Sequence, residues 1–203
     1  ENYLSKIEHR MGQDTLRLEK EVRSILNGVK RRGDEALVHY ARAFDGVRIS
    51  VHQLRVERRE VEQAYKKISP DFLRTLEKAS RRIRKFHRLR SSKSITDVEK
   101  GIRLGQVIRP LERVGVYVPG GKASYPSTVL MAAIPAKVSG VQEIVMATPP
   151  QKEGISPAVL VAADLAGVAY ARTVASGADA NFSVARRVGN RDTRATLFSV
   201  CDS

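Results

Sequence analysis

Hydrophobic and polar positions alternate in two different ways along the chain, and the change comes near Gly101. In the N-terminal half, apolar residues recur every three or four positions, as at Val22, Ile25, Leu26 and Val29. This spacing is one face of an α-helix. After Gly101, short apolar runs are joined to apolar helix-like segments through glycine and proline. That order is typical of parallel strands connected by helices, so the sequence predicts an α/β fold.

The N-terminal half is predicted to be mainly helical. After the first helix, "DEALVHYARAFDG" predicts a second short helix, and "ISVHQLRV" has the alternation of a short strand. "ERREVEQAYKKI" predicts another helix, and a long basic helix is expected from Pro70 to about Arg90. The stretch "SSKSITDVEKG" is interpreted as a polar connector.

The C-terminal half is predicted to contain the sheet. "IRLGQVIRP" and "VGVYVP" have the pattern of strands, and "EIVMATPP" that of a short buried strand. Two apolar helices are expected between and after them. The first begins near Pro126, since proline is tolerated in the first turn of a helix, and the second is closed by Gly167.

Composition fits a globular protein. The chain has 203 residues, of which 42% are apolar and 29% charged, which is ordinary for a folded domain. No apolar stretch approaches the length of a membrane span, and the polar start has no signal-peptide layout. A single cysteine, Cys201, excludes an internal disulfide framework and fits a reducing compartment. We therefore expect a cytoplasmic protein that does not enter the membrane.

The formal net charge of +14 raises a nucleic-acid hypothesis, because clustered cations neutralise phosphates. The densest cluster is Arg81–Arg90. Its apolar residues Leu76, Ala79, Ile83 and Phe86 follow helical spacing, so the cations form the solvated face of an amphipathic helix. No zinc-finger spacing and no RNP-type aromatic motif is present. The solvated face is the favoured interpretation, and a nucleic-acid site is the alternative.

Chemistry-bearing residues gather where a strand meets a helix, in "YVPGGKASYPS". A helix that begins after a strand presents unpaired backbone N–H groups and the positive end of its dipole. Gly120 and Gly121 would let a phosphate or a flat ring approach the backbone, and Tyr117 could pack on that ring. The alternative is a tight turn with Tyr117 in the core. The G-x-G-x-x-G fingerprint is absent, so the residue pattern leaves both open.

The stretch "RVGVYVPGGKASYPSTVLMAAIPAKVSGVQEIVMATPP" resembles the NAD-dependent histidinol dehydrogenases, as does "VKRRGDEALVHYARAFDGV" upstream. The resemblance runs from about Val22 to Ala166. It implies a fold with incomplete Rossmann-like domains. It also implies an activity: zinc-dependent homodimers of this family oxidise L-histidinol to L-histidine in two NAD-linked steps, the end of histidine biosynthesis.

The same resemblance bears on the domains and implies the cofactor site. The residue pattern predicts a mainly helical segment at 1–100, and pattern and resemblance together predict an incomplete Rossmann-like parallel sheet with flanking helices at 101–180. The segment 181–203 departs from the family and is interpreted as a divergent tail, for which disorder is one interpretation. The family's tyrosine before Pro-Gly-Gly contacts NAD and corresponds to Tyr117. Pro119, Gly120 and Gly121 form the adjoining loop.

Other functional residues of the family have no counterpart in this sequence. The resemblance places the zinc ligands, the Glu-His acid–base pair and the substrate contacts further downstream, so we assign no catalytic residue and no metal ligand. Asp179 replaces a glutamine that holds NAD in the family, and Ser176 replaces a glycine. The four histidines are interpreted as surface or satisfied core residues: His9, His39, His52 and His87.

We therefore expect a truncated histidinol dehydrogenase that is inactive alone, binds NAD weakly, and forms a homodimer or otherwise self-associates. A frameshift near "VGNRDT" is one explanation for the divergent tail. The first alternative is a shortened, non-catalytic paralogue with a nucleotide-binding or regulatory role. The second is a basic nucleic-acid-binding module.

Overall fold

The computed structural model describes residues 19–90, 94–120, 124–173 and 195–199. The first helix of the described part covers residues 19–32. The other helices are α2 (Asp34–Phe44), the short 3₁₀ helix η1 (Val51–Leu54), α3 (Arg58–Lys67), α4 (Pro70–Leu89), α5 (Pro126–Val138) and α6 (Pro157–Ala166). The strands are β1 (Ile95–Glu99), β2 (Ile102–Gln106), β3 (Arg113–Tyr117), β4 (Glu143–Thr148), β5 (Tyr170–Thr173) and β6 (Ala195–Ser199).

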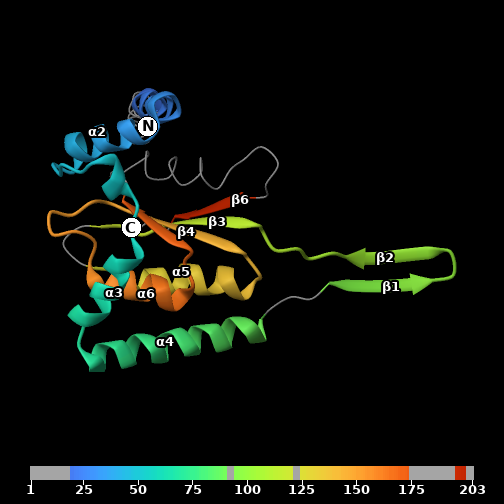
Figure 1. Ribbon diagram of the computed structural model, residues 1–203. Coiled ribbons are helices and arrows are strands. Elements are labelled where there is room, and N and C mark those ends of the chain that lie inside the picture. The colour runs from blue at the N-terminus through green and yellow to red at the C-terminus, as the bar shows by residue number, and fades with distance from the viewer. Residues whose placement is uncertain (1–18, 91–93, 121–123, 174–194, 200–203) are drawn as a thin grey trace, which may run out of the picture.

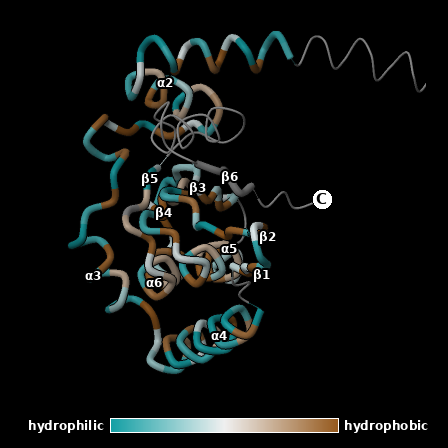
Figure 2. The backbone as a smooth tube through the Cα atoms, turned by 90° about the vertical axis from the view of Figure 1, so that its right-hand side faces the viewer, coloured by the Kyte–Doolittle hydropathy of each residue, from teal (hydrophilic) through white to brown (hydrophobic). Residues whose placement is uncertain are grey.

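Four strands form a parallel sheet in the order β5-β4-β3-β6. Helices α5 and α6 cover one face, and α4 packs outside them, while α2 and the helix of residues 19–32 lie on the other face (Figures 1 and 2). Parallel sheets are stable when both faces are covered. The result is an α/β fold, as the pattern of apolar runs predicted.

Each face of the sheet has its own buried cluster. On the α5 and α6 side, Val114 and Val116 of β3 pack with Ile144 of β4. On the α2 side, Val145 and Ala147 of β4 pack with residues of the N-terminal helices and η1. Successive residues of a strand point to opposite faces, so β4, buried from its second residue onward, contributes to both clusters.

The helices next to the sheet begin and end near the predicted positions. Helix α5 begins at Pro126 and continues through Pro135. Gly167 ends α6 in the left-handed conformation, with φ of 82°, which glycine adopts without steric cost. The predictions for α2, α3 and α4 are also confirmed. No helix within the described ranges is long and apolar enough to cross a membrane.

The strand predicted for "ISVHQLRV" is wrong, because residues 51–54 form η1. Ser50 and Gln53 make a capping box: the backbone N–H of Ser50 donates to the Gln53 side-chain oxygen at 2.8 Å. This local hydrogen bond stabilises a helical turn and outweighs the weak alternation of apolar residues. Only the next residue, Arg55, makes a β-bridge, and its partner is Arg172.

The polar connector predicted before Gly101 is also wrong. Strand β1 lies within it and pairs in antiparallel fashion with β2. The first five residues of "IRLGQVIRP" are therefore a strand, β2, but it belongs to this hairpin and not to the parallel sheet. The hairpin turns at Gly101, where φ is 85°, and projects away from the helices and the sheet (Figure 1).

Several predicted positions lie outside the described residues. They include His9, Gly121, Ser176, Asp179 and Cys201. Of the segment 181–203, the structure describes β6, which pairs with β3.

Candidate nucleotide-binding site

The carboxyl end of β3 lies at the point where the connections of the sheet change direction. From β3 the chain proceeds to β4 and β5 on one side, and β6 then pairs with β3 on the other. Ligands of open α/β sheets bind outside the carboxyl ends of the strands at such a switch point. From the sheet order we therefore infer that the residues after β3 form the candidate site.

Tyr117 is the last residue of β3 and pairs in register with Ala147 of β4. Its ring is half-buried and packs on the α2-side cluster, which includes Val29, Leu37 and Leu54. The ring is therefore partly in the core and partly accessible at the edge of the sheet. This position suits a stacking or hydrogen-bonding contact with a ligand, and it also stabilises the packing of the N-terminal helices.

Gly120 packs closely against another residue of the protein. A Cβ placed on Gly120 would lie 3.0 Å from Cγ and 3.2 Å from Cδ of Pro149. Such contacts are closer than packed carbon atoms normally come. The missing side chain thus lets the turn after β3 pack on the proline that follows β4, which is the tight-turn interpretation for this glycine.

Helix α5 adds an N-terminus at the same edge of the sheet. It begins at Pro126, and the N-cap residue Tyr125 forms no side-chain capping hydrogen bond. An uncapped first turn leaves backbone N–H groups that can receive an anion. Pro119 lines a cavity of about 10 Å³ next to the start of α6, which is room for about one water molecule. A nucleotide would therefore lie over this edge, outside that cavity.

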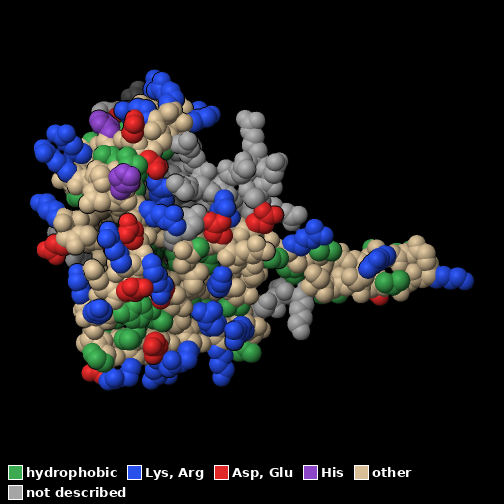
Figure 3. Space-filling view, viewed as in Figure 1, with side chains coloured by type: hydrophobic (Ala, Val, Ile, Leu, Met, Phe, Trp, Pro, Cys, Tyr) green, Lys and Arg blue, Asp and Glu red, His purple; other side chains and the backbone are tan. Residues whose placement is uncertain are grey.

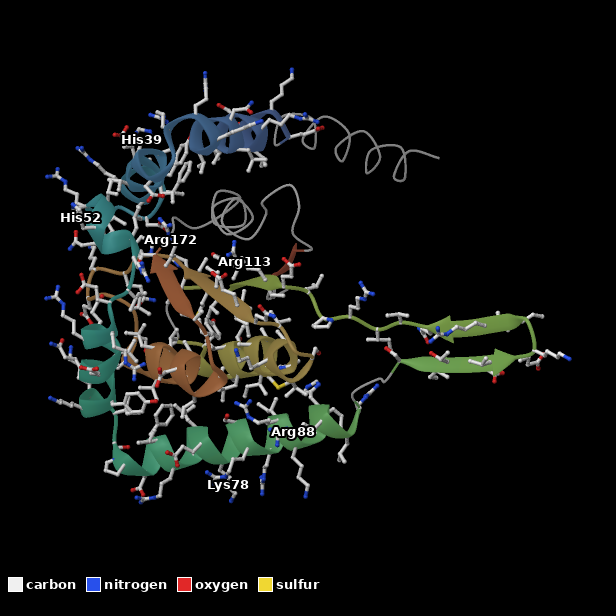
Figure 4. All side chains as sticks on the ribbon, turned by 45° about the vertical axis from the view of Figure 1, so that its right-hand side comes forward. His39, His52, Lys78, Arg88, Arg113 and Arg172 are labelled. Carbon is white, nitrogen blue, oxygen red and sulfur yellow. The ribbon has the colours of Figure 1, made fainter. Side chains whose placement is uncertain are left out.

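Arg172 is a residue that the sequence reasoning missed. It lies on β5 in register with Ala147, so it shares the sheet face and the row of Tyr117. Its side chain is 6% exposed, and Nη2 lies 2.9 Å from Oδ1 of Asp34. Its Nε has no hydrogen-bond partner among the described residues. Figure 4 shows Arg172 on β5.

A second charged group ties α3 to α6. Asp164 accepts hydrogen bonds from Arg58 Nη1 at 2.6 Å and from the Tyr65 hydroxyl at 2.9 Å. Burial, followed by the hydrogen bond to Asp164, raises the pKa of Tyr65 to about 12. The hydrogen bond to Asp164 also raises the pKa of Arg58. Tyr65 packs on the cluster of the α5 and α6 side, whereas Tyr117 packs on the cluster of the α2 side. The contact of Arg58 and Tyr65 with Asp164 is therefore structural.

Zinc does not fit the side chains that the structure describes. Within the described ranges, no group of three or more His, Cys, Asp or Glu side chains could hold a metal ion. His39, His52 and His87 lie on α2, η1 and α4, and Figure 4 labels the first two. The candidate site is thus the carboxyl edge of the parallel sheet at β3, and the described residues there form no metal-binding group.

Comparison with known proteins identifies the family. The family model for histidinol dehydrogenase matches residues 8–185. The histidinol dehydrogenase of Caldanaerobacter subterraneus is 46% identical over 164 residues, and that of Listeria monocytogenes is 49% identical over 156 residues. The crystal structure of histidinol dehydrogenase from Elizabethkingia anophelis superposes with a TM-score of 0.80 at 29% identity over 91% of this chain. The chain belongs to the histidinol dehydrogenase family.

The match covers a minority of each relative. It extends over 81% of this chain but 38% of the Caldanaerobacter protein, and over 76% of this chain but 36% of the Listeria protein. The Elizabethkingia structure is covered to 42%. The match therefore establishes the family and the fold of this chain, and it does not extend to the activity of the whole relatives.

Proposed function

We propose that this chain provides the N-terminal part of a histidinol dehydrogenase, in which the end of β3 contacts NAD. The family oxidises L-histidinol to L-histidine in the cytoplasm, as a homodimer. The position of Tyr117 supports the proposal: the tyrosine of the Tyr-Val-Pro-Gly-Gly block is half-exposed at the switch point of the sheet, where α/β proteins bind nucleotides.

The residues around Tyr117 have distinct roles in this proposal. The ring of Tyr117 packs against the nucleotide, and Pro119 and Gly120 bring the backbone close to it. The family resemblance adds Gly121, which lies outside the described residues. The uncapped start of α5 adds backbone N–H donors and a favourable dipole for the pyrophosphate. These contacts are few, so they offset the entropy lost on binding only in part. We therefore expect weak NAD affinity.

Catalysis requires groups that the described residues do not bring together. Zinc, when bound, polarises an oxygen of the substrate, and a general base removes its proton. The family resemblance places those groups downstream of the matched region, and the described residues form no metal-binding group. The alternative hypothesis, a shortened and non-catalytic paralogue, also predicts NAD binding without turnover.

The cations of α4 do not favour the nucleic-acid alternative. Leu76 and Ser80 of α4 are buried, and Ala79 and Ile83 pack on the core. The basic side chains therefore lie on the solvated face of an amphipathic helix (Figure 3). A face of this kind is ordinary for a surface helix.

The proposal is tested by titrating NAD into the isotope-labelled 203-residue chain and following the backbone amides by NMR. We expect shifts at Gly120 and in the first turn of α5. Tyr117→Ala should weaken the effect about tenfold, because base stacking on an aromatic ring is worth ~1–3 kcal/mol. Tyr117→Phe keeps the ring and should bind nearly as well. Lys78→Ala, on the outside of α4, is the matched control.

A parallel assay follows NADH formation with NAD, zinc and histidinol. We expect none above background from this chain alone, and turnover that copurifies with it would refute this expectation. Unmoved Gly120 amides at saturating NAD would instead contradict the nucleotide site. A melting curve for Tyr117→Ala separates loss of binding from loss of packing.

A further inference from the structure

A second cavity lies at the carboxyl edge of the sheet, beside β5. Its volume is about 560 Å³, which is within the usual range for small-molecule sites. Its lining includes residues 47–49, η1 and the start of α3. It also includes the loop after β4 and Thr173 at the end of β5. The cavity therefore lies at the edge where α/β sheets bind ligands.

The wall of this cavity is positively charged. Four permanent cations line it: Arg48, Arg55, Arg59 and Lys152. His52 lines it as well. Two carboxylates line it as well, those of Glu57 and Glu60. Four cations against two carboxylates leave a net charge of +2 before His52 is counted. Clefts lined by one sign of charge concentrate ligands of the opposite sign.

Both carboxylates already interact within α3. Glu57 Oε2 lies 2.8 Å from Nε of Arg59, and Glu60 Oε2 accepts the backbone N–H of Glu57 at 2.7 Å. By contrast, neither Arg48 nor Lys152 forms an ion pair with a described residue. Both cations line the cavity and are available to a ligand.

The loop after β4 is built to present Lys152. Residues 151–154 form a turn in which the Gly154 N–H donates to the Gln151 carbonyl at 3.0 Å. Gly154 has φ of 83°, a conformation that other residues adopt only with strain. Lys152 lines the cavity, whereas its neighbour Glu153 does not. The turn thus places Lys152, and not the adjacent carboxylate, in the lining of the cavity.

The remaining lining fits an uncharged group attached to an anion. Amide side chains of Gln53, Gln63 and Gln151 add hydrogen-bonding groups. Apolar side chains, among them Ile49 and Ile155, provide surface for a ring or an alkyl chain. Small-molecule sites commonly combine apolar surface with a few such polar groups.

We propose that this cavity binds a phosphorylated small molecule, whose phosphates contact Arg48 and Lys152 and whose organic part lies over Ile49 and Ile155. The site is separate from the proposed NAD position, because Tyr117, Pro119 and Gly120 do not line it. The inference therefore does not depend on NAD binding at β3.

The test uses the 203-residue chain with ADP, pyrophosphate and adenosine as probes, followed by calorimetry and by NMR of the labelled chain. ADP and pyrophosphate should shift amides at residues 47–53 and 151–155, whereas adenosine should not. The double variant Arg48→Ala/Lys152→Ala should bind pyrophosphate about tenfold or more weakly, because two charge-assisted contacts are lost.

The control removes the same charge elsewhere. Lys78→Ala/Arg88→Ala takes two cations from α4, which lies apart from η1 and His52 (Figure 4), and should change pyrophosphate affinity by about twofold or less at physiological salt. An equal loss in both double variants would reveal non-specific attraction to a basic surface and would overturn the proposal. So would an absence of binding, or ADP shifts confined to the turn after β3.

Discussion

Gly120 is a residue whose role depends on its neighbours and not on the sequence around it. Two adjacent glycines after a strand indicate backbone access, but the pattern cannot distinguish access for a ligand from access for the protein itself. The structure shows that the Cβ position of Gly120 is adjacent to Pro149. Both explanations can hold together, because a backbone that packs closely on Pro149 is also fixed in position for a nucleotide.

Gly120→Ala should therefore destabilise the fold. A methyl group 3.0 Å from Cγ of a buried proline forces a shift of a rigid ring, and overpacking of this kind costs about 1–3 kcal/mol. Urea unfolding of the two proteins measures the difference. In a Pro149→Ala background the same change should cost less, since the clashing ring is gone. Equal costs in both backgrounds would show that Pro149 is not the cause.

Tyr117 and Arg172 show which parts of the site a sequence can indicate. Tyr117 stands in a dense local pattern, strand, Pro-Gly-Gly and helix, so its place at a strand end could be predicted. Arg172 could not, because its partner Asp34 is 138 residues away. A buried arginine is stable only when it is paired, and no local pattern reveals a partner on another element.

At the scale of elements, the contact between α3 and α6 provides a pH-dependent test. Tyr65 donates to Asp164, and its pKa is raised from 10.0 to about 12. The fold therefore favours the neutral phenol. This stabilisation is fully present below pH 10 and is lost as the pH rises from 10 to about 12, because the unfolded chain releases this proton first.

Phenolate absorbance should show one of the six tyrosines ionising near pH 12 in the folded protein. Tyr65→Phe should remove that late step. Asp164→Asn should lower the pKa only in part, since burial is the larger cause of the shift. A late step that persists in Tyr65→Phe would assign it to another tyrosine.

The elements that could be predicted are those with strong local signals. Helices α5 and α6 begin at prolines and are apolar, and β3 and β4 are short apolar runs between turns. Two elements were predicted wrongly for physical reasons. A side-chain hydrogen bond at Ser50 converts a weakly alternating stretch into η1. Strand β1 contains charged residues and is exposed throughout. It is a strand because it pairs with β2, and not because its side chains are buried.

At the scale of the whole molecule, the hairpin of β1 and β2 is the least covered part of the described structure. All ten residues of the two strands are exposed, and the hairpin extends well beyond the sheet and helices (Figure 1). A two-stranded hairpin alone is marginally stable in water. Ile95, Val98, Ile102 and Leu104 are each between 56% and 68% exposed, so a covering surface would stabilise it.

We expect the chain to self-associate through this hairpin. The strand register places Ile95, Ile102 and Leu104 on one face, together with Asp97, Glu99 and Gln106, and places Val98 on the other with Thr96, Arg103 and Gly105. The first face carries three of the four large apolar side chains, and burying them against a second copy removes this surface from water. Sedimentation velocity over a range of concentrations should show a reversible dimer or a larger species.

Two double variants distinguish the faces of the hairpin. Ile95→Ser/Leu104→Ser should shift the equilibrium toward monomer by about tenfold or more, since each buried aliphatic side chain contributes ~1.5–3 kcal/mol. Thr96→Ser/Val98→Ser changes the opposite face and should have a smaller effect. A chain that stays monomeric at every concentration would contradict the prediction. Equal effects of both variants would mean that the hairpin mediates association but that the face with Ile95 and Leu104 is not the preferred contact.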